Sequence, residues 1–90
     1  MEGNGRLEPR VAQVFADRFQ TEPGDLAGDL LDSGLVDSVR LVDLVLELER
    51  RFAISLPFDA LEIDDFRTVE RIAALVGRTA ANGAEAPARE

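Results

Sequence analysis

Apolar residues recur at a helical spacing in three segments of this chain, and each segment predicts an α-helix. The first helix is expected over residues 7–19, and the last begins after Thr68, whose hydroxyl suits the N-cap position. Between the second and last helices, residues 57–63 predict a short, irregular helical segment that opens with a proline. The apolar positions of the first helix are Leu7, Val11, Val14 and Phe15, and those of the last are Val69, Ile72, Ala73 and Val76.

The longest helix is predicted over residues 38–52 and carries two apolar stripes instead of one. The stripe expected to face the core consists of Leu41, Leu44, Val45, Leu48 and Phe52. The second stripe lies on nearly the opposite side and consists of Val39, Val42 and Leu46, with Asp43, Glu47 and Arg50 beside it. This second stripe either packs beneath the preceding loop or faces a partner protein, and the pattern allows both.

Residues 21–36 form a loop that is long for so small a domain and leads directly into the longest helix. The fold class predicted from these elements is all-α: a small four-helix bundle of three main helices and one short helix, with this loop between the first two. The domain is expected over residues 7–78, between disordered ends at residues 1–6 and 79–90. The turn signals within the loop are Pro23-Gly24, Gly28 and Asp32-Ser33-Gly34.

The start of the longest helix carries the candidate site. Asp37 is predicted to be its N-cap, because a carboxylate there accepts a hydrogen bond from an amide of the first turn. Val36 and Leu41 have the spacing of a hydrophobic staple around this cap. Ser38 then occupies the first helical position, with its hydroxyl pointing outward. Free amides and the positive end of the helix dipole make this a favourable place for a phosphate.

Composition excludes several classes of chemistry. The chain has no Cys and no His, which rules out disulfides, Cys/His zinc sites, thiol nucleophiles and His-based triads. No EF-hand spacing is present, and no metal site is expected. The sequence contains no apolar run of membrane-spanning length and no signal-peptide pattern, so a soluble, cytoplasmic protein without an integral membrane segment is expected. A monomer is the expectation for this size and charge.

The net charge of −8 argues against a nucleic-acid partner, whose phosphates need basic residues. Acidic residues cluster around the candidate site: residues 22–49 contain eight acids and a single base, Arg40. A second acidic group follows within residues 59–65. The acids are read either as a solvated surface that keeps the protein soluble or as a docking face for a basic partner.

Three segments of the chain resemble those of acyl carrier proteins. Asp37-Ser38-Val39, which follows Gly34-Leu35 and opens the second helix, resembles the attachment motif of that family. The segment LERRFAISLP at residues 48–57 resembles the family's end of helix 2 and its following I-x-[ILV]-P motif, and Phe66-Arg67-Thr68-Val69 resembles the entry into its last helix. The Gly-Leu-Val-Asp-Ser form is similar to that of D-alanyl carrier proteins and of discrete carriers in specialised biosynthetic pathways.

The resemblance implies that Ser38 holds a 4′-phosphopantetheine arm, which a phosphopantetheinyl transferase moves from coenzyme A. The thiol of this arm carries an acyl or aminoacyl cargo as a thioester, and the carrier itself catalyses nothing. Further partners implied are the enzyme that loads the cargo and the enzymes that process it. Arg40 stands where fatty-acid carriers often have an acid. With Arg40 included, the partner surface that the resemblance implies consists of Asp37, Val39, Arg40, Val42, Asp43, Leu46 and Glu49.

Two other functions are compatible with parts of the pattern. A carrier-like domain that is never modified would act as an acidic adaptor, and Ser38→Ala would then leave its function intact. An enzyme would need a base paired with a nucleophile; Asp64-Asp65 supply carboxylates, but no further motif supports them. The sequence therefore favours a discrete carrier protein that is not an enzyme.

Overall fold

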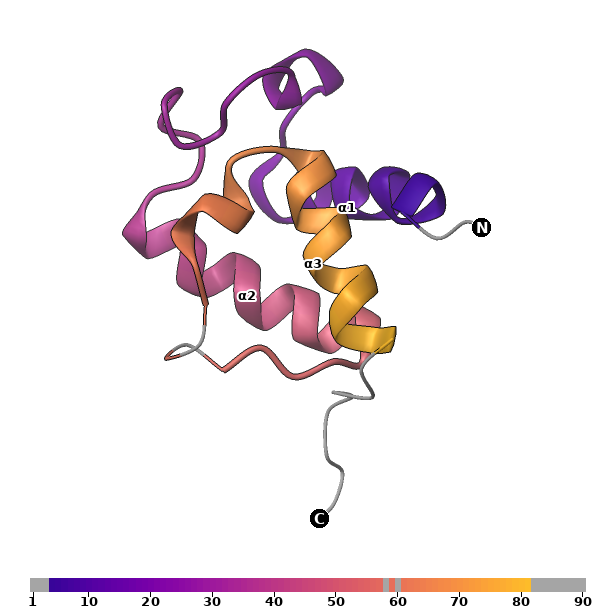
Figure 1. The fold of residues 1–90 in the computed structure, drawn as a ribbon. Helices are drawn as coiled ribbons and strands as arrows, with labels where there is room; N and C mark the ends of the chain where they lie inside the picture. Colours follow the sequence, from indigo (N-terminus) through magenta and orange to yellow (C-terminus); the bar gives the residue numbers. More distant parts are fainter. Residues whose placement is uncertain (1–3, 58, 60, 82–90) are drawn as a thin grey trace.

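The computed structural model describes residues 4–57, 59 and 61–81. Within these residues the regular elements are all helical and Ile54 is an isolated bridge position, which confirms the predicted all-α class. The three α-helices surround a common core, and the long loop between the first two runs over one end of the helices (Figure 1). The elements, in chain order, are α1 (Asn4–Phe19), the 3₁₀-helix η1 (Pro23–Leu26), α2 (Ser38–Phe52), the 3₁₀-helix η3 (Ile63–Phe66) and α3 (Val69–Ala81).

The helix boundaries agree with the prediction for α2, which begins at Ser38 and ends at Phe52. Helix α1 begins three residues before the predicted start, and α3 continues to Ala81. Residues 4–6 and 79–81 are therefore helical although they were expected in disordered ends, because a helix can extend beyond its last packed residue through local hydrogen bonds. The remaining parts of those ends, 1–3 and 82–90, lie outside the described residues. The extent of the domain stays a prediction.

The fourth, short helix predicted over residues 57–63 is not confirmed. Residues 58 and 60 of that segment lie outside the described residues. The short element that the structure places here is η3, which begins where the predicted segment ends. Its last residue, Phe66, is fully buried and anchors the turn in the core. Over residues 4–57, 59 and 61–81, the structure therefore shows three α-helices joined by segments that contain short helical turns.

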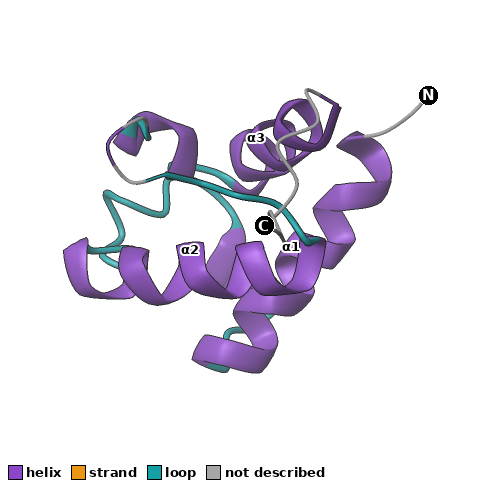
Figure 2. Cartoon of the chain, turned by 90° about the horizontal axis from the view of Figure 1, so that it is seen from below, coloured by secondary structure: helices purple, strands orange, loops and turns teal. Residues whose placement is uncertain are grey.

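The core forms where α1 packs against α3 and α2. The expected apolar faces supply it, and the long loop adds Leu30 and Val36. Figure 2 shows α2 crossing α1, with the connection from α2 toward η3 returning along α2. No helix in the described ranges has the length and apolarity needed to span a membrane. The buried apolar residues are Val11, Val14, Phe15, Leu30, Val36, Leu44, Val45, Leu48, Ile54, Leu56, Phe66, Val69, Ile72, Ala73, Leu75 and Val76.

Candidate functional site

The predicted cap at the start of α2 is confirmed. Asp37 has extended backbone dihedral angles, and its Oδ1 accepts hydrogen bonds from the amides of Val39 at 3.0 Å and Arg40 at 2.9 Å. The amide of Leu41 donates to the carbonyl of Asp37 at 2.8 Å. Helix α2 consequently begins at Ser38, which is exposed.

This cap changes the expected environment of Ser38. The amides of Val39 and Arg40, expected to be free for a phosphate, are both occupied by the Asp37 carboxylate. A phosphate on Ser38 would therefore lie beside a carboxylate and not in a ring of open amides. The site fits a group that is covalently attached to an accessible hydroxyl better than it fits a free anion.

The turn that precedes the cap is closed by its own hydrogen bonds. Asp29 Oδ1 accepts from the amides of Leu31 and Asp32, each at 2.9 Å. The amide of Val36 returns to the carbonyl of Leu30 at 3.0 Å, and both of these side chains are buried. Gly34 completes the turn with a φ of 84°, a conformation that suits glycine. The chain therefore enters the cap from a compact and anchored turn.

The second apolar stripe of α2 is exposed. Val39 is 78% exposed, Val42 46% and Leu46 53%. Burial beneath the preceding loop, which was one reading of the stripe, is therefore wrong. Leu44, Val45 and Leu48 on the opposite side are fully buried, so α2 uses one face for the core and leaves the other open.

A family model described as "Phosphopantetheine attachment site" matches residues 9–76, most of the chain. The chain belongs to this family. The D-alanyl carrier protein of Streptococcus sanguinis (strain SK36) is 33% identical over 67 residues, which are 73% of this chain and 85% of that protein. The D-alanyl carrier protein of Lactococcus lactis subsp. cremoris (strain MG1363) is 44% identical over 52 residues, or 58% and 66% of the two chains.

These matches confirm the resemblance to acyl carrier proteins and place the chain close to D-alanyl carriers. Proteins of this kind are carriers and not catalysts, and the family implies a covalently attached 4′-phosphopantetheine. Ser38 and the exposed stripe lie on α2, directly after the Asp37 cap.

The acids expected around the site of this carrier have partners within the fold. Asp43 Oδ1 lies 2.8 Å from Arg18 Nη2 of α1, with both side chains 46% exposed. Glu49 Oε2 accepts a hydrogen bond from the amide of Leu56 at 2.7 Å, so it holds the segment after α2 against that helix. Since Asp37 is the cap, each acid of the implied partner surface already makes an internal contact.

The Arg40 side chain also makes contacts within the protein. Its Nη1 donates to the carbonyl of Leu35 at 3.3 Å, and its guanidinium carbon lies 5.5 Å from the centre of the Phe19 ring. Together with Asp25, Ser33, Gly34 and Leu35, it lines a shallow depression of about 320 Å³ beside the turn. Arg40 therefore lies at the loop side of α2, away from the exposed stripe.

Glu47 differs most from its expected position. It was expected beside the outward stripe, yet its side chain is only 10% exposed. Arg51 donates to Glu47 Oε2 at 2.6 Å and Arg50 donates to the same oxygen. These hydrogen bonds hold the pKa of Glu47 below its usual range, and the one from Arg51 has the largest effect. Arg51 also binds Asp17 Oδ2 at 2.9 Å, so this group joins α2 to α1.

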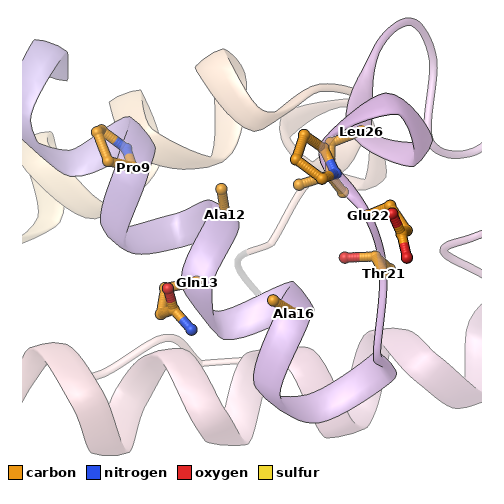
Figure 3. A pocket seen from close by; sticks show the side chains of 8 residues that line it. Pro9, Ala12, Gln13, Ala16, Thr21, Glu22 and Leu26 are labelled. Carbon is orange, nitrogen blue, oxygen red and sulfur yellow. The ribbon is translucent and has the colours of Figure 1, made fainter.

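A separate depression of about 280 Å³ lies between α1 and the following segment (Figure 3). Its lining includes Pro9, Ala12, Ala16 and Leu26. The Thr21 hydroxyl oxygen at its edge is buried without a hydrogen-bond partner among the described residues. None of the predicted site residues lines this depression.

The sequence did not predict the residue that connects the turn before Ser38 to the segment between η3 and α3. Arg67, between η3 and α3, places Nη1 3.0 Å from Asp29 Oδ2 and Nε 2.7 Å from Asp64 Oδ1. The available signal was weak: Arg67 is a lone base directly after the second acidic group. Its partner in the loop, 38 residues earlier, could not be read from helical spacing.

Proposed function

We propose that Ser38 is the attachment point of the 4′-phosphopantetheine arm and that this protein is a discrete acyl or aminoacyl carrier. The observation that carries the proposal is the exposed position of Ser38 as the first residue of α2, directly after the Asp37 cap and within the Asp-Ser-Val motif. When bound, the arm supplies a terminal thiol that holds cargo as a thioester, which a chain without cysteine does not itself provide.

The role of the chain in its own modification is to present one hydroxyl. The Ser38 oxygen forms a bond to the pantetheine-bearing phosphorus of coenzyme A, and the pyrophosphate bond breaks. Adenosine bisphosphate leaves, and the hydroxyl proton passes to a base of the phosphopantetheinyl transferase. Because Asp37 fixes the backbone through the amides of Val39 and Arg40, the Cα of Ser38 is held at one place on the surface.

The partner surface that we propose is centred on the exposed stripe of Val39, Val42 and Leu46. Asp37, Asp43 and Glu49 lie near this stripe, and each of these carboxylates already makes a contact within the fold, whereas Arg40 lies on the loop side of α2. We therefore expect contact with the transferase, the loading enzyme and the processing enzymes to rest mainly on apolar burial, with weak dependence on salt. This differs from a purely acidic docking face.

The similarity to D-alanyl carrier proteins supports a small aminoacyl cargo, with D-alanine as the first candidate, over a long fatty acyl chain. We place the carrier in a dedicated biosynthetic pathway in the cytoplasm, acting as a monomer with the four-helix carrier fold over residues 7–78. The alternative, an unmodified acidic adaptor, is disfavoured by the match to a family of attachment sites.

Intact-mass spectrometry tests the assignment of Ser38. The chain is incubated with coenzyme A, Mg²⁺ and a broad-specificity phosphopantetheinyl transferase, alongside Ser38→Ala and the matched control Ser55→Ala. We expect one added phosphopantetheine on the parent and on Ser55→Ala, and none on Ser38→Ala. A gain that persists in Ser38→Ala would move the site elsewhere, and no gain on a folded parent would favour the adaptor.

A further inference from the structure

Arg67 binds the turn before Ser38 through both its backbone and its side chain. The amide of Leu30 donates to the carbonyl of Arg67 at 2.6 Å. The guanidinium of Arg67 contacts Asp29 Oδ2 at 3.0 Å, and the same group lies 3.9 Å from Asp32 Oδ1. The first residues of the turn are thus held by the segment between η3 and α3.

Asp29 links Arg67 to the backbone of the turn. Its Oδ2 faces Arg67 while its Oδ1 accepts from the amides of Leu31 and Asp32. These hydrogen bonds lower the pKa of Asp29, and the amide of Asp32 has the largest effect. The contact with Arg67 lowers the pKa further. A carboxylate held at both oxygens has one orientation, so the turn amides have one arrangement.

Arg67 is also held from its other side. Its Nε donates to Asp64 Oδ1 of η3 at 2.7 Å, so one guanidinium spans two carboxylates from different segments. A planar guanidinium has several donors in a fixed geometry, which lets it join two carboxylates where a lysine ammonium would favour one. Arg67 thereby joins the turn at residues 29–36 to η3.

We propose that Arg67 is a positioning residue for the modification of Ser38. It holds the turn at residues 29–36 in the conformation that leads into the Asp37 cap, and so presents the start of α2 to the transferase. This inference rests on the proposed function, in which Ser38 is the attachment point. Arg67 acts through the turn and the cap and does not itself touch the reacting atoms.

The proposal predicts a specific kinetic pattern. Without the Arg67 side chain, the turn samples other conformations, and only a fraction of molecules presents Ser38 correctly. A lower competent fraction raises the apparent KM and leaves kcat unchanged. We expect Arg67→Met to raise the KM of the transferase for this carrier by about fivefold, with kcat within about twofold of the parent.

The matched control is Arg78→Met. Arg78 of α3 also binds an acid of η3, with Nη2 2.9 Å from Asp65 Oδ2, but this ion pair does not involve the turn at residues 29–36. Amide hydrogen exchange supplies a readout that does not depend on modification. In Arg67→Met the amides of Leu31, Asp32 and Val36 should exchange faster than in the parent, while the amides of Leu44 and Leu48 should not change. Arg78→Met should leave both groups and the KM unchanged.

Arg67→Lys is the second variant. It keeps a positive charge near Asp29 but does not span both carboxylates, so an intermediate KM and intermediate exchange are expected. If Arg67→Met does not fold, as judged by circular dichroism, the same comparison with Arg67→Lys decides. A parental KM and parental exchange in the folded variant would overturn the proposal. If the parent acquires no arm, the proposed function fails. The role of Arg67 in holding the turn is then judged from exchange alone, and parental exchange rates in the folded Arg67 variant would overturn that role as well.

Discussion

The guanidinium of Arg18 in α1 donates a hydrogen bond to the carboxylate of Asp43 in α2 at 2.8 Å. This contact raises the pKa of Arg18 and sets a cation beside an acid that borders the exposed stripe of α2. Asp43, the residue after Val42, is therefore paired with an arginine of the same chain, and both side chains are 46% exposed. We therefore expect the stripe to offer a partner mainly apolar surface.

Removing the charge of Asp43 should consequently have little effect on partner binding. We expect Asp43→Asn to change kcat/KM for the transferase by less than about twofold, at both about 0.05 M and about 0.5 M salt. Arg18→Gln, which frees the Asp43 carboxylate, is the companion variant. A tenfold loss in Asp43→Asn, largest at low salt, would show that Asp43 leaves Arg18 to bind the enzyme.

The apolar stripe should carry most of the binding free energy. Leu46→Gln keeps a good helix former at a position that is 53% exposed, so the stability of the fold should change by no more than about 0.5 kcal/mol. The loss of apolar burial in the complex should lower kcat/KM about tenfold, corresponding to about 1.4 kcal/mol. Denaturation and transferase kinetics measure the two effects.

Ile63→Gln is the control for Leu46→Gln. Ile63 is 50% exposed but belongs to η3 and not to α2. Its replacement should leave kcat/KM within about twofold of the parent. Equal losses for the two variants would mean that apolar exposure in general, and not the α2 stripe, determines recognition.

The Asp37 cap should contribute measurably to stability. Asp37→Ala removes the acceptor for the amides of Val39 and Arg40, which typically costs about 1 kcal/mol. Asp37→Asn retains a capping oxygen and should remain within about 0.5 kcal/mol of the parent. Urea denaturation of the three proteins distinguishes these values. Equal stability of Asp37→Ala and the parent would show that the cap is dispensable for the fold.

Glu47 should make the stability of the fold depend on pH in the acidic range. Its pKa is lower in the folded chain than in the unfolded one, chiefly because Arg51 and then Arg50 donate hydrogen bonds to it. A carboxylate with a lowered folded pKa stabilises the fold above its unfolded pKa, and this contribution is lost as the pH falls through the folded pKa. Glu47→Gln should therefore be less stable than the parent at about pH 7, with the difference shrinking toward about pH 3.

Denaturation midpoints of the parent and Glu47→Gln across this range test the prediction. Glu70→Gln, at an exposed acid of α3, is the control and should follow the parent at every pH. A deficit of Glu47→Gln that stays constant from neutral to acidic pH would show that packing, and not the charge of Glu47, stabilises this position.

Much of the site could be predicted because it depends on local chemistry. The cap at Asp37, the start of α2 at Ser38 and the two faces of α2 follow from hydrogen-bonding rules and helical periodicity within fifteen residues. Thr68 likewise caps the last helix, with its Oγ1 accepting from the amide of Arg71 at 3.1 Å. Helix ends away from such caps, at Asn4 and Ala81, were less well predicted because no local signal marks them.

The residues around Ser38 are enough to predict that an exposed serine opens a two-faced helix, since a side chain's direction around its own helix depends only on its neighbours. Which charged groups are paired with one another depends instead on how the helices pack. Asp43 pairs with a residue 25 positions away and Asp29 with one 38 positions away. Such pairs form only when packing brings α1, α2 and the segment before α3 together, and that placement is not encoded in any local spacing.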